Sequence, residues 1–208
     1  MKDGICYIVG AGECFGLDFS LCETDYLIAA DGGLHHIEAH GLCADMVVGD
    51  FDSCTPPCGH PNVLTLRREK DETDLFAALH EGIRLGYCRF HLYCATGGRI
   101  DHTMANLQLL AYLSRRGFSA FLIDRHSVIT AITDGSFHFD SSCQGMLSVF
   151  CAGDKALGVS LSGVKYELDC VTLTGDIPLG ISNEFLGTES CISVEQGTLL
   201  LVYPRLRS

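Results

Sequence analysis

The sequence is 208 residues long and 47% of it is hydrophobic, enough to build the core of one large domain or two small ones. Its formal net charge of −12 argues against a nucleic-acid partner, because proteins that bind phosphate backbones carry basic patches. No stretch approaches the roughly 20 uncharged apolar residues that a bilayer span requires, so we expect no membrane partner.

The first 125 residues alternate between strand-like and helix-like runs. Strands are predicted over residues 5–12, 25–33, 45–52, 62–67, 89–98 and 119–124, and helices from about residue 34, over residues 71–86 and over residues 101–117. Strands this apolar, separated by helices, indicate a parallel sheet covered on both faces. Ligands of such sheets bind beyond the carboxyl ends of the strands.

From about residue 126 the sequence changes to short β-rich runs separated by Gly, Asp and Ser. Between residues 126 and 204 the only Lys or Arg residues are Lys155 and Lys165. We therefore predict an α/β fold with two domains. Residues 1–125 form a Rossmann-like parallel sheet with flanking helices, and residues 126–208 form an all-β sandwich.

Acidic residues recur where the predicted strands end. Asp31 follows the second strand, and Asp50 and Asp52 close the third. Asp50 and Asp52 point the same way because residues i and i+2 of an extended segment share a face. Asp71 and Asp74 share a face of a first helical turn. Taken singly, these two are equally typical of capping and helix-dipole residues.

Several carboxylates at one rim repel one another unless a cation lies among them. Their hard oxygen atoms suit Mg²⁺, which one or two carboxylates and substrate phosphates usually hold. The run "GGRIDH" supplies the complementary phosphate-binding groups. Gly97 and Gly98 allow a close approach of the backbone to a ligand, and Arg99 can form two hydrogen bonds with phosphate. The alternative is a plain turn with Asp101 as the helix N-cap.

Two other motifs fail on inspection. The run "VGAGECFG" lacks the third glycine of a dinucleotide fingerprint, because Phe15 stands there and Gly16 comes one residue late. The pair in "GDFDS" also looks like the nucleophile loop of haloacid dehalogenase-type phosphatases, but here it follows the second or third strand rather than the first. There is no G-x-x-x-x-G-K-[ST] phosphate loop either.

The twelve cysteines are scattered inside apolar segments, which favours reduced thiols over a disulfide scaffold. The chain also starts with a short polar stretch and a strand-like run rather than a signal peptide, so we expect a cytoplasmic protein. Cys54, Cys58 and His60 form one cluster, but no second pair of ligands for structural zinc is visible. A turn that carries thiols is the simpler interpretation, and metal binding there is left open.

Five motifs occur in the order and with the spacing of the thiamin pyrophosphokinase family: "AADGG", "VVGDFDS", "KDETDL", "GGRIDHTMANLQLL" and "ISNEF". The chain resembles that family over nearly its whole length. The resemblance implies transfer of a pyrophosphoryl group from ATP to thiamin, with AMP as the other product. It also implies a homodimer whose active sites lie between the catalytic domain of one subunit and the β-sandwich of the other.

The resemblance further implies roles for individual residues. Asp50, Asp52 and Asp74 would hold Mg²⁺ on the nucleotide phosphates, and Asp31 and Asp71 would complete the acidic rim. Asp71 is the expected acceptor of the thiamin hydroxyl proton. The expected phosphate- and nucleotide-binding residues are Gly97, Gly98, Arg99, Asp101 and Asn106, of which Asp101 and Asn106 would either order the loop or contact the nucleotide.

Ser182 and Asn183 match a Ser-Asn pair that hydrogen-bonds the aminopyrimidine of thiamin, although "GISNEF" by itself would predict only a polar turn. Animal members of the family place a tryptophan against thiamin, and this sequence has none. Phe185 or another ring would have to stack there. Two further functions stay open: another magnesium-dependent phosphotransferase or phosphatase, and a non-catalytic nucleotide or thiamin sensor.

Overall fold

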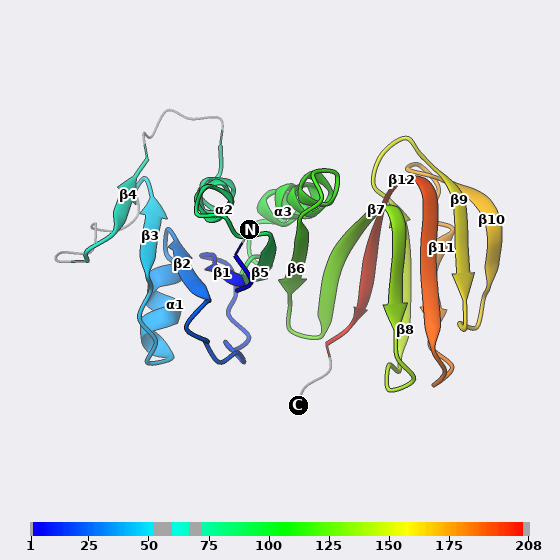
Figure 1. The fold of residues 1–208 in the computed structure, drawn as a ribbon, viewed down its shortest axis with the longest axis horizontal. Helices are drawn as coiled ribbons and strands as arrows, with labels where there is room; N and C mark the ends of the chain where they lie inside the picture. The colour runs from blue at the N-terminus through cyan, green and yellow to red at the C-terminus, as the bar shows by residue number, and fades with distance from the viewer. Residues whose placement is uncertain (1, 52–59, 67–71, 206–208) are drawn as a thin grey trace. The chain divides into compact units, whose positions relative to one another are not determined.

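The structure is a computed structural model that describes residues 2–51, 60–66 and 72–205. It is a mixed α/β fold (Figure 1), and the chain divides into two compact units. The first comprises Met1–Asn106 with Leu122–Asp124, and the second comprises Leu107–Phe121 with Arg125–Ser208. Within the described ranges, no helix is long and apolar enough to cross a membrane.

The first unit is built on a parallel sheet. Its strands are β1 (Cys6–Val9), β2 (Tyr26–Ala30), β3 (Met46–Gly49), β4 (Val63–Thr65) and β5 (Arg89–Tyr93), and its helices include α1 (Gly33–Ala39) and α2 (Asp74–Arg84). These five strands lie in the order β4-β3-β2-β1-β5, and the printed pairs β1–β2, β1–β5, β2–β3 and β3–β4 are all parallel. All four side chains of β1 are buried, as expected for a strand covered on both faces. The predicted parallel pairing is confirmed.

The order of these strands places a topological switch point in the sheet. From β1 the chain adds β2, β3 and β4 on one side, and it then returns to add β5 on the other side of β1. The connections after β1 and β5 therefore diverge at their carboxyl ends. In open α/β sheets a ligand-binding crevice forms at such a place.

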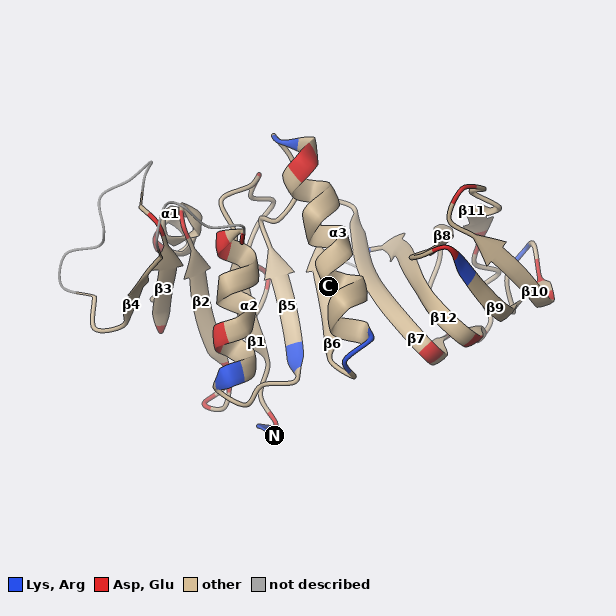
Figure 2. Ribbon diagram, turned by 90° about the horizontal axis from the view of Figure 1, so that it is seen from above, with Lys and Arg blue, Asp and Glu red and all other residues tan. Residues whose placement is uncertain are grey.

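Helices α1 and α2 lie on opposite faces of this sheet (Figures 1 and 2). In α2, Leu75, Ala78, Leu79 and Gly82 are buried, at the spacing of one helical face. Helix α1 comes so close to β1 that a methyl group built on Gly33 would lie 1.9 Å from the Val9 carbonyl oxygen. Glycine is required there because no larger residue leaves room for the strand.

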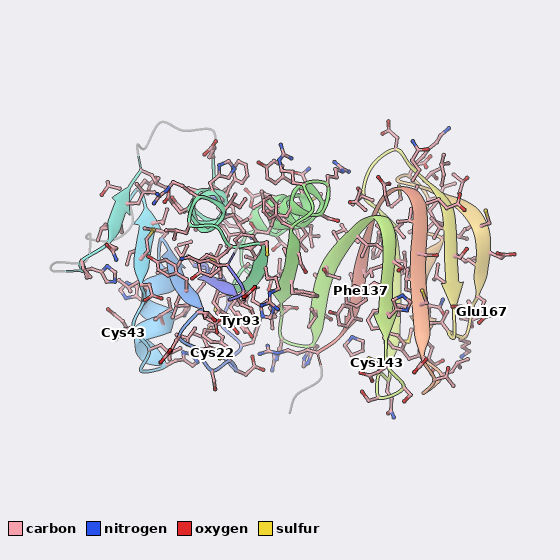
Figure 3. All side chains as sticks on the ribbon, in the orientation of Figure 1. Cys22, Cys43, Tyr93, Phe137, Cys143 and Glu167 are labelled. Carbon is pink, nitrogen blue, oxygen red and sulfur yellow. The ribbon has the colours of Figure 1, made fainter. Side chains whose placement is uncertain are left out.

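Helix α3 (Ile100–Ser114) and strand β6 (Ser119–Ile123) contribute residues to both units. The second unit also holds β7 (Ser127–Phe139), β8 (Met146–Cys151), β9 (Lys155–Ser162), β10 (Leu168–Thr174), β11 (Gly180–Glu184) and β12 (Ser190–Pro204). Among β7 to β12 the printed pairs are antiparallel, and β12 pairs with β7, β8 and β9. Its core includes Leu147, Val159, Leu161 and Leu199, with Phe137 packed against it (Figure 3).

Two strands of the second unit are longer than predicted. The runs "SVITAIT" and "SFHFD" form the single strand β7, and "CISVEQG" and "TLLLVYP" form the single strand β12. The polar residues between the runs shift the β7–β12 register between Val194 and Thr198 instead of turning the chain. Asp134 and Gly197 have positive φ values of 47° and 116° there, and the Gly197 N–H donates to Asp134 Oδ1 at 2.7 Å. A β-bulge therefore lies where the sequence suggested a break between separate strands.

Candidate functional site

A cavity of about 460 Å³ lies in the first unit at the carboxyl ends of its strands. Its walls come from the segments after β1, β2 and β5, from the start of α2, and from α3. The segments after β1 and β5 are joined: the Gly12 N–H donates to the Cys94 carbonyl at 2.8 Å, and the Glu13 N–H donates to that of Thr96 at 2.9 Å. The cavity thus occupies the switch point of the sheet.

The backbone at this edge is strained in three places. Asp31, Phe51 and Cys94 follow β2, β3 and β5, and they have positive φ values of 49°, 53° and 51°. Residues other than glycine rarely adopt this backbone conformation, because it costs on the order of 1 kcal/mol or more. It persists only where the surrounding structure enforces it. Such residues gather at functional sites. The strain therefore marks the ends of three strands as the functional edge of the sheet.

Asp31 and Asp74 both line the cavity. The Asp31 N–H donates to the Val48 carbonyl at 2.7 Å, which fixes Asp31 beside the end of β3. Asp74 is the first residue of α2, and Thr73 caps that helix by accepting the Phe76 N–H at 3.3 Å. Thr73 is therefore the N-cap residue of α2. Asp74 lies in the first turn, where the helix dipole stabilises a negative charge.

The glycine loop also reaches the cavity, through Gly97, Gly98 and Arg99. Gly97 and Gly98 have φ values of 80° and 60°, which explains why glycine stands at both positions. Arg99 is exposed, and its guanidinium group forms two hydrogen bonds with Asp101, at 3.2 Å and 2.5 Å. These bonds raise the pKa of Arg99 and lower the pKa of Asp101. Figure 2 shows a basic and an acidic segment next to each other at the start of α3.

Asn106 anchors the same loop from below. It is 6% exposed, and its Nδ2 donates to the Ala95 carbonyl at 2.7 Å. Thr96, which follows Ala95, is also held in place, because its Oγ1 donates to Asp124 Oδ1 at 2.5 Å. The segment between β5 and α3 is thus held by side-chain hydrogen bonds, while its glycines leave the backbone open to a ligand.

Six of the predicted nucleotide- and metal-site residues line one cavity. They are Asp31, Asp74, Gly97, Gly98, Arg99 and Asn106. Asp50 directly follows β3 but does not line the cavity, and neither does Asp101. Asp52 and Asp71 lie outside the described residues. Across the part of the chain that is described, no three His, Cys, Asp or Glu side chains are grouped closely enough to hold a metal ion.

Glu13 and His102 also line the cavity, although neither was predicted as a site residue. Glu13 lies in the glycine-rich segment after β1, its side chain packs against Gly97, and its Oε1 accepts the Gly98 N–H at 3.4 Å. His102 lines the cavity from α3. The failed dinucleotide fingerprint still carried a usable signal, because glycines after a first strand bring that segment to the carboxyl edge of the sheet.

The "ISNEF" segment belongs to the second unit, and the polar turn expected from its residues alone is wrong. Residues Gly180–Glu184 form strand β11, which pairs with β8. Ser182 is exposed and has a φ of 59°, whereas Asn183 is 4% exposed. The register shifts between Gly180 and Asn183, so a β-bulge accommodates the polar residues that suggested a turn.

His60 is the one member of its cysteine cluster that the structure describes, since Cys54 and Cys58 lie outside the described ranges. Both ring nitrogens of His60 face backbone carbonyl oxygens: Nδ1 lies 3.0 Å from that of Asn62, and Nε2 lies 2.9 Å from that of Ala44. The ring is thus held by the backbone of its own segment and by that of the segment before β3.

Two family models match the chain, one after the other. The thiamin pyrophosphokinase catalytic domain matches residues 20–122, and the thiamin pyrophosphokinase vitamin B1 binding domain matches residues 136–199. Thiamine pyrophosphokinase of Bacillus subtilis (strain 168) is 27% identical over 187 residues, which cover 86% of this chain and 87% of that protein. The two models and the relative agree on one family along most of the sequence.

Solved structures agree as well. The crystal structure of thiamine pyrophosphokinase from Bacillus subtilis superposes with a TM-score of 0.86 at 25% identity, covering 98% of this chain and 100% of its own. That of thiamin pyrophosphokinase from Geobacillus thermodenitrificans gives a TM-score of 0.84 at 27% identity, covering 98% and 99%. With its acidic cavity and glycine loop, the chain belongs to the thiamin pyrophosphokinase family, enzymes that transfer a pyrophosphoryl group from ATP to thiamin.

Proposed function

We propose that the chain performs this transfer by in-line attack of the thiamin hydroxyl on the β-phosphorus of ATP, assisted by Mg²⁺. The observation that carries the proposal is the single cavity in which Asp31 and Asp74 meet the glycine loop and Arg99. Phosphoryl transfer depends mainly on positioning and on neutralising charge, and it needs no covalent intermediate with the enzyme. A cavity with both acidic and phosphate-binding groups suits that requirement.

The carboxylates fit a magnesium ion by their chemistry. Asp50, Asp52 and Asp74 offer hard oxygen atoms, and Mg²⁺ is usually held by one or two carboxylates together with substrate phosphates. A complete protein cage is therefore not needed. When bound, Mg²⁺ would neutralise charge on the phosphates and hold them in line for attack.

The protein's own groups would bind and orient the two substrates. Arg99 would exchange Asp101 for phosphate oxygens, and the open backbone at Gly97 and Gly98 would admit the triphosphate closely. Asn106 keeps that loop in place through its bond to the Ala95 carbonyl. Asp71 would accept the proton of the thiamin hydroxyl. Asp31 would complete the acidic rim.

Residues 1–125 would serve as the catalytic domain and residues 126–208 as a β-sandwich that binds thiamin through Ser182 and Asn183.

We further propose a cytoplasmic homodimer with each active site between the catalytic domain of one subunit and the β-sandwich of the other. Apolar side chains on and next to β11 support an interface there: Ile177, Leu179, Ile181 and Leu186 are 52–61% exposed. Contiguous exposed apolar patches are typical of interaction surfaces. All ten described cysteines are free thiols, as a reducing compartment favours.

The test is incubation of the purified protein with ATP, Mg²⁺ and thiamin, followed by separation of the products. We expect AMP and thiamin pyrophosphate in equal amounts, with none of either when EDTA removes the divalent ion. Release of inorganic phosphate without thiamin pyrophosphate would instead identify a phosphatase. Light scattering at several protein concentrations would check the dimer.

A further inference from the structure

The two glycines of the loop after β5 differ in their surroundings. A methyl group built on Gly98 would meet no described atom within 4 Å beyond its chain neighbours. A methyl group built on Gly97 would lie 2.6 Å, 2.7 Å and 2.8 Å from the Cγ, Cδ and Cβ atoms of Glu13. The stem of the Glu13 side chain therefore covers the backbone at Gly97, where a phosphate group would approach the loop.

The backbone that carries Glu13 is held by hydrogen bonds from two directions. The Gly12 N–H donates to the Cys94 carbonyl at 2.8 Å, and the Glu13 N–H donates to the Thr96 carbonyl at 2.9 Å. His36 Nε2 lies 3.0 Å from the Gly12 carbonyl oxygen, which joins the segment to α1. Since the backbone cannot shift without breaking these bonds, the side chain of Glu13 is the part that can move.

The carboxylate of Glu13 is exposed and weakly held. Its Oε1 accepts the Gly98 N–H at 3.4 Å. That distance is longer than the usual range of about 2.7–3.2 Å, so the bond is weak and a ligand can replace it. The N–H group that it occupies is also one that a phosphate oxygen would use. Glu13 is therefore a displaceable occupant of the glycine loop.

The cavity holds more acidic than basic groups. Glu13, Asp31 and Asp74 line it, and Arg99 is the one Lys or Arg among its described lining residues. The Arg99 guanidinium group is already paired with Asp101. Carboxylates at one site repel further negative charge. A nucleotide without a divalent ion adds the full charge of its phosphates to this set, whereas Mg²⁺ on the phosphates offsets part of that charge.

We infer that Glu13 is a specificity-determining residue, which covers the glycine loop and disfavours nucleotides that carry no divalent ion. This inference rests on the proposed function, because it assigns the glycine loop to the phosphates of ATP. A metal-free triphosphate must displace the Glu13 carboxylate and then stay beside it. With Mg²⁺ on the phosphates the repulsion is smaller, so the site selects the magnesium complex over the free nucleotide.

Isothermal titration calorimetry with ATP, in EDTA and in excess Mg²⁺, measures this selection without turnover. Glu13→Gln keeps the shape of the side chain and removes its charge. We expect the Kd of metal-free ATP to fall about fivefold to tenfold and that of the magnesium complex about twofold. Glu13→Ala also uncovers Gly97 and should bind both forms at least as tightly as Glu13→Gln. Added salt should narrow the difference between the parent and Glu13→Gln, because the effect is electrostatic.

Glu23→Gln is the matched control. It removes the same charge from the same segment, and Glu23 is exposed and does not line the cavity. Both of its Kd values should equal those of the parent. Thermal melts should place each variant within about 2 °C of the parent, because the altered side chains are exposed.

An equal preference for the magnesium complex in the parent and in Glu13→Gln would overturn the inference. So would weaker binding of both forms by Glu13→Gln, which would show that Glu13 itself binds the nucleotide. Failure of the proposed function is distinguishable. A parent that binds magnesium-ATP but forms no thiamin pyrophosphate would contradict the proposed function and leave the role of Glu13 standing, whereas a parent that binds no magnesium-ATP would overturn both.

Discussion

Arg99 and Asp101 hold each other in a double hydrogen bond at the start of α3, at 3.2 Å and 2.5 Å, on the rim of the cavity. Both side chains are largely exposed, so the pair contributes little to stability. The Asp101 carboxylate accepts the guanidinium N–H groups that would otherwise donate to a phosphate. In the proposed function the pair positions Arg99, and Asp101 would compete with the nucleotide for the guanidinium group.

Changing the two residues separately should have opposite effects. Arg99→Ala should raise the KM of ATP about tenfold or more, because a charge-assisted hydrogen bond contributes on the order of 1.5–3 kcal/mol. Asp101→Asn should lower that KM about twofold, because the competing charge is gone. Neither change should move Tm by more than about 2 °C. An Asp101→Asn enzyme as impaired as Arg99→Ala would mean that Asp101 itself binds the nucleotide.

Neighbouring residues at the start of α2 should separate catalysis from stability. Asp74→Asn should reduce turnover at least about a hundredfold with nearly unchanged Tm, because the cap at Thr73 remains. Thr73→Ala should lower the unfolding free energy by about 1 kcal/mol, the usual contribution of an N-cap. Activity assays and thermal melts of both variants check the pair. Normal turnover in Asp74→Asn would show that Asp74 does not bind the metal ion.

Asn106→Ala should destabilise the protein and loosen the loop above it. The change leaves the buried Ala95 carbonyl without its side-chain donor, which costs about 1–3 kcal/mol. Amide hydrogen exchange should therefore increase over residues 95–98, with a lower Tm. Gln108→Ala is the control, since Gln108 is exposed on the same helix and should have little effect. Equal protection of residues 95–98 in both variants would contradict the anchoring role.

Burial raises the pKa of the Cys6 thiol from 9.0 to about 12, with Asp45 adding to the shift and Lys2 opposing it. Below pH 9 the thiol is neutral in both the folded and the unfolded chain, so it adds no pH dependence. Between pH 9 and about 12 the unfolded chain loses the proton first, and the folded state is progressively destabilised. Denaturant unfolding at pH 7.5 and pH 10.5 should show this loss.

Cys6→Ala should reduce that alkaline loss of stability, whereas alanine at the exposed Cys43 should not. Tyr203, whose pKa burial also raises to about 12, leaves a residual dependence in the same pH range. An unchanged alkaline slope in Cys6→Ala would show that the Cys6 thiol does not cause the effect.

The elements of the first unit could be read from the sequence because local pattern determines them. The continuous apolar run at Cys6–Val9 can be buried on both faces only as a strand. The apolar residues in Asp74–Arg84 share one face only in a helix. The position of Asp31 and Arg99 after strands followed from the same reasoning, since the carboxyl ends of parallel strands share an edge. Predictions failed in the second unit, where residues expected in turns lie in bulged strands, because cross-strand pairing outweighs local turn preference.

The sequence by itself determined that acidic residues and a glycine loop would meet at the end of a parallel sheet, because periodicity and strand polarity are local properties. The tertiary structure alone decided which residues share the cavity. The return of the chain from β4 to β5 brings Glu13 against Gly97, 84 positions away. Likewise, only folding brings Asn183 to the backbone of Tyr166. Hydrogen-bond partners distant in sequence depend on strand order and register, which no local pattern specifies.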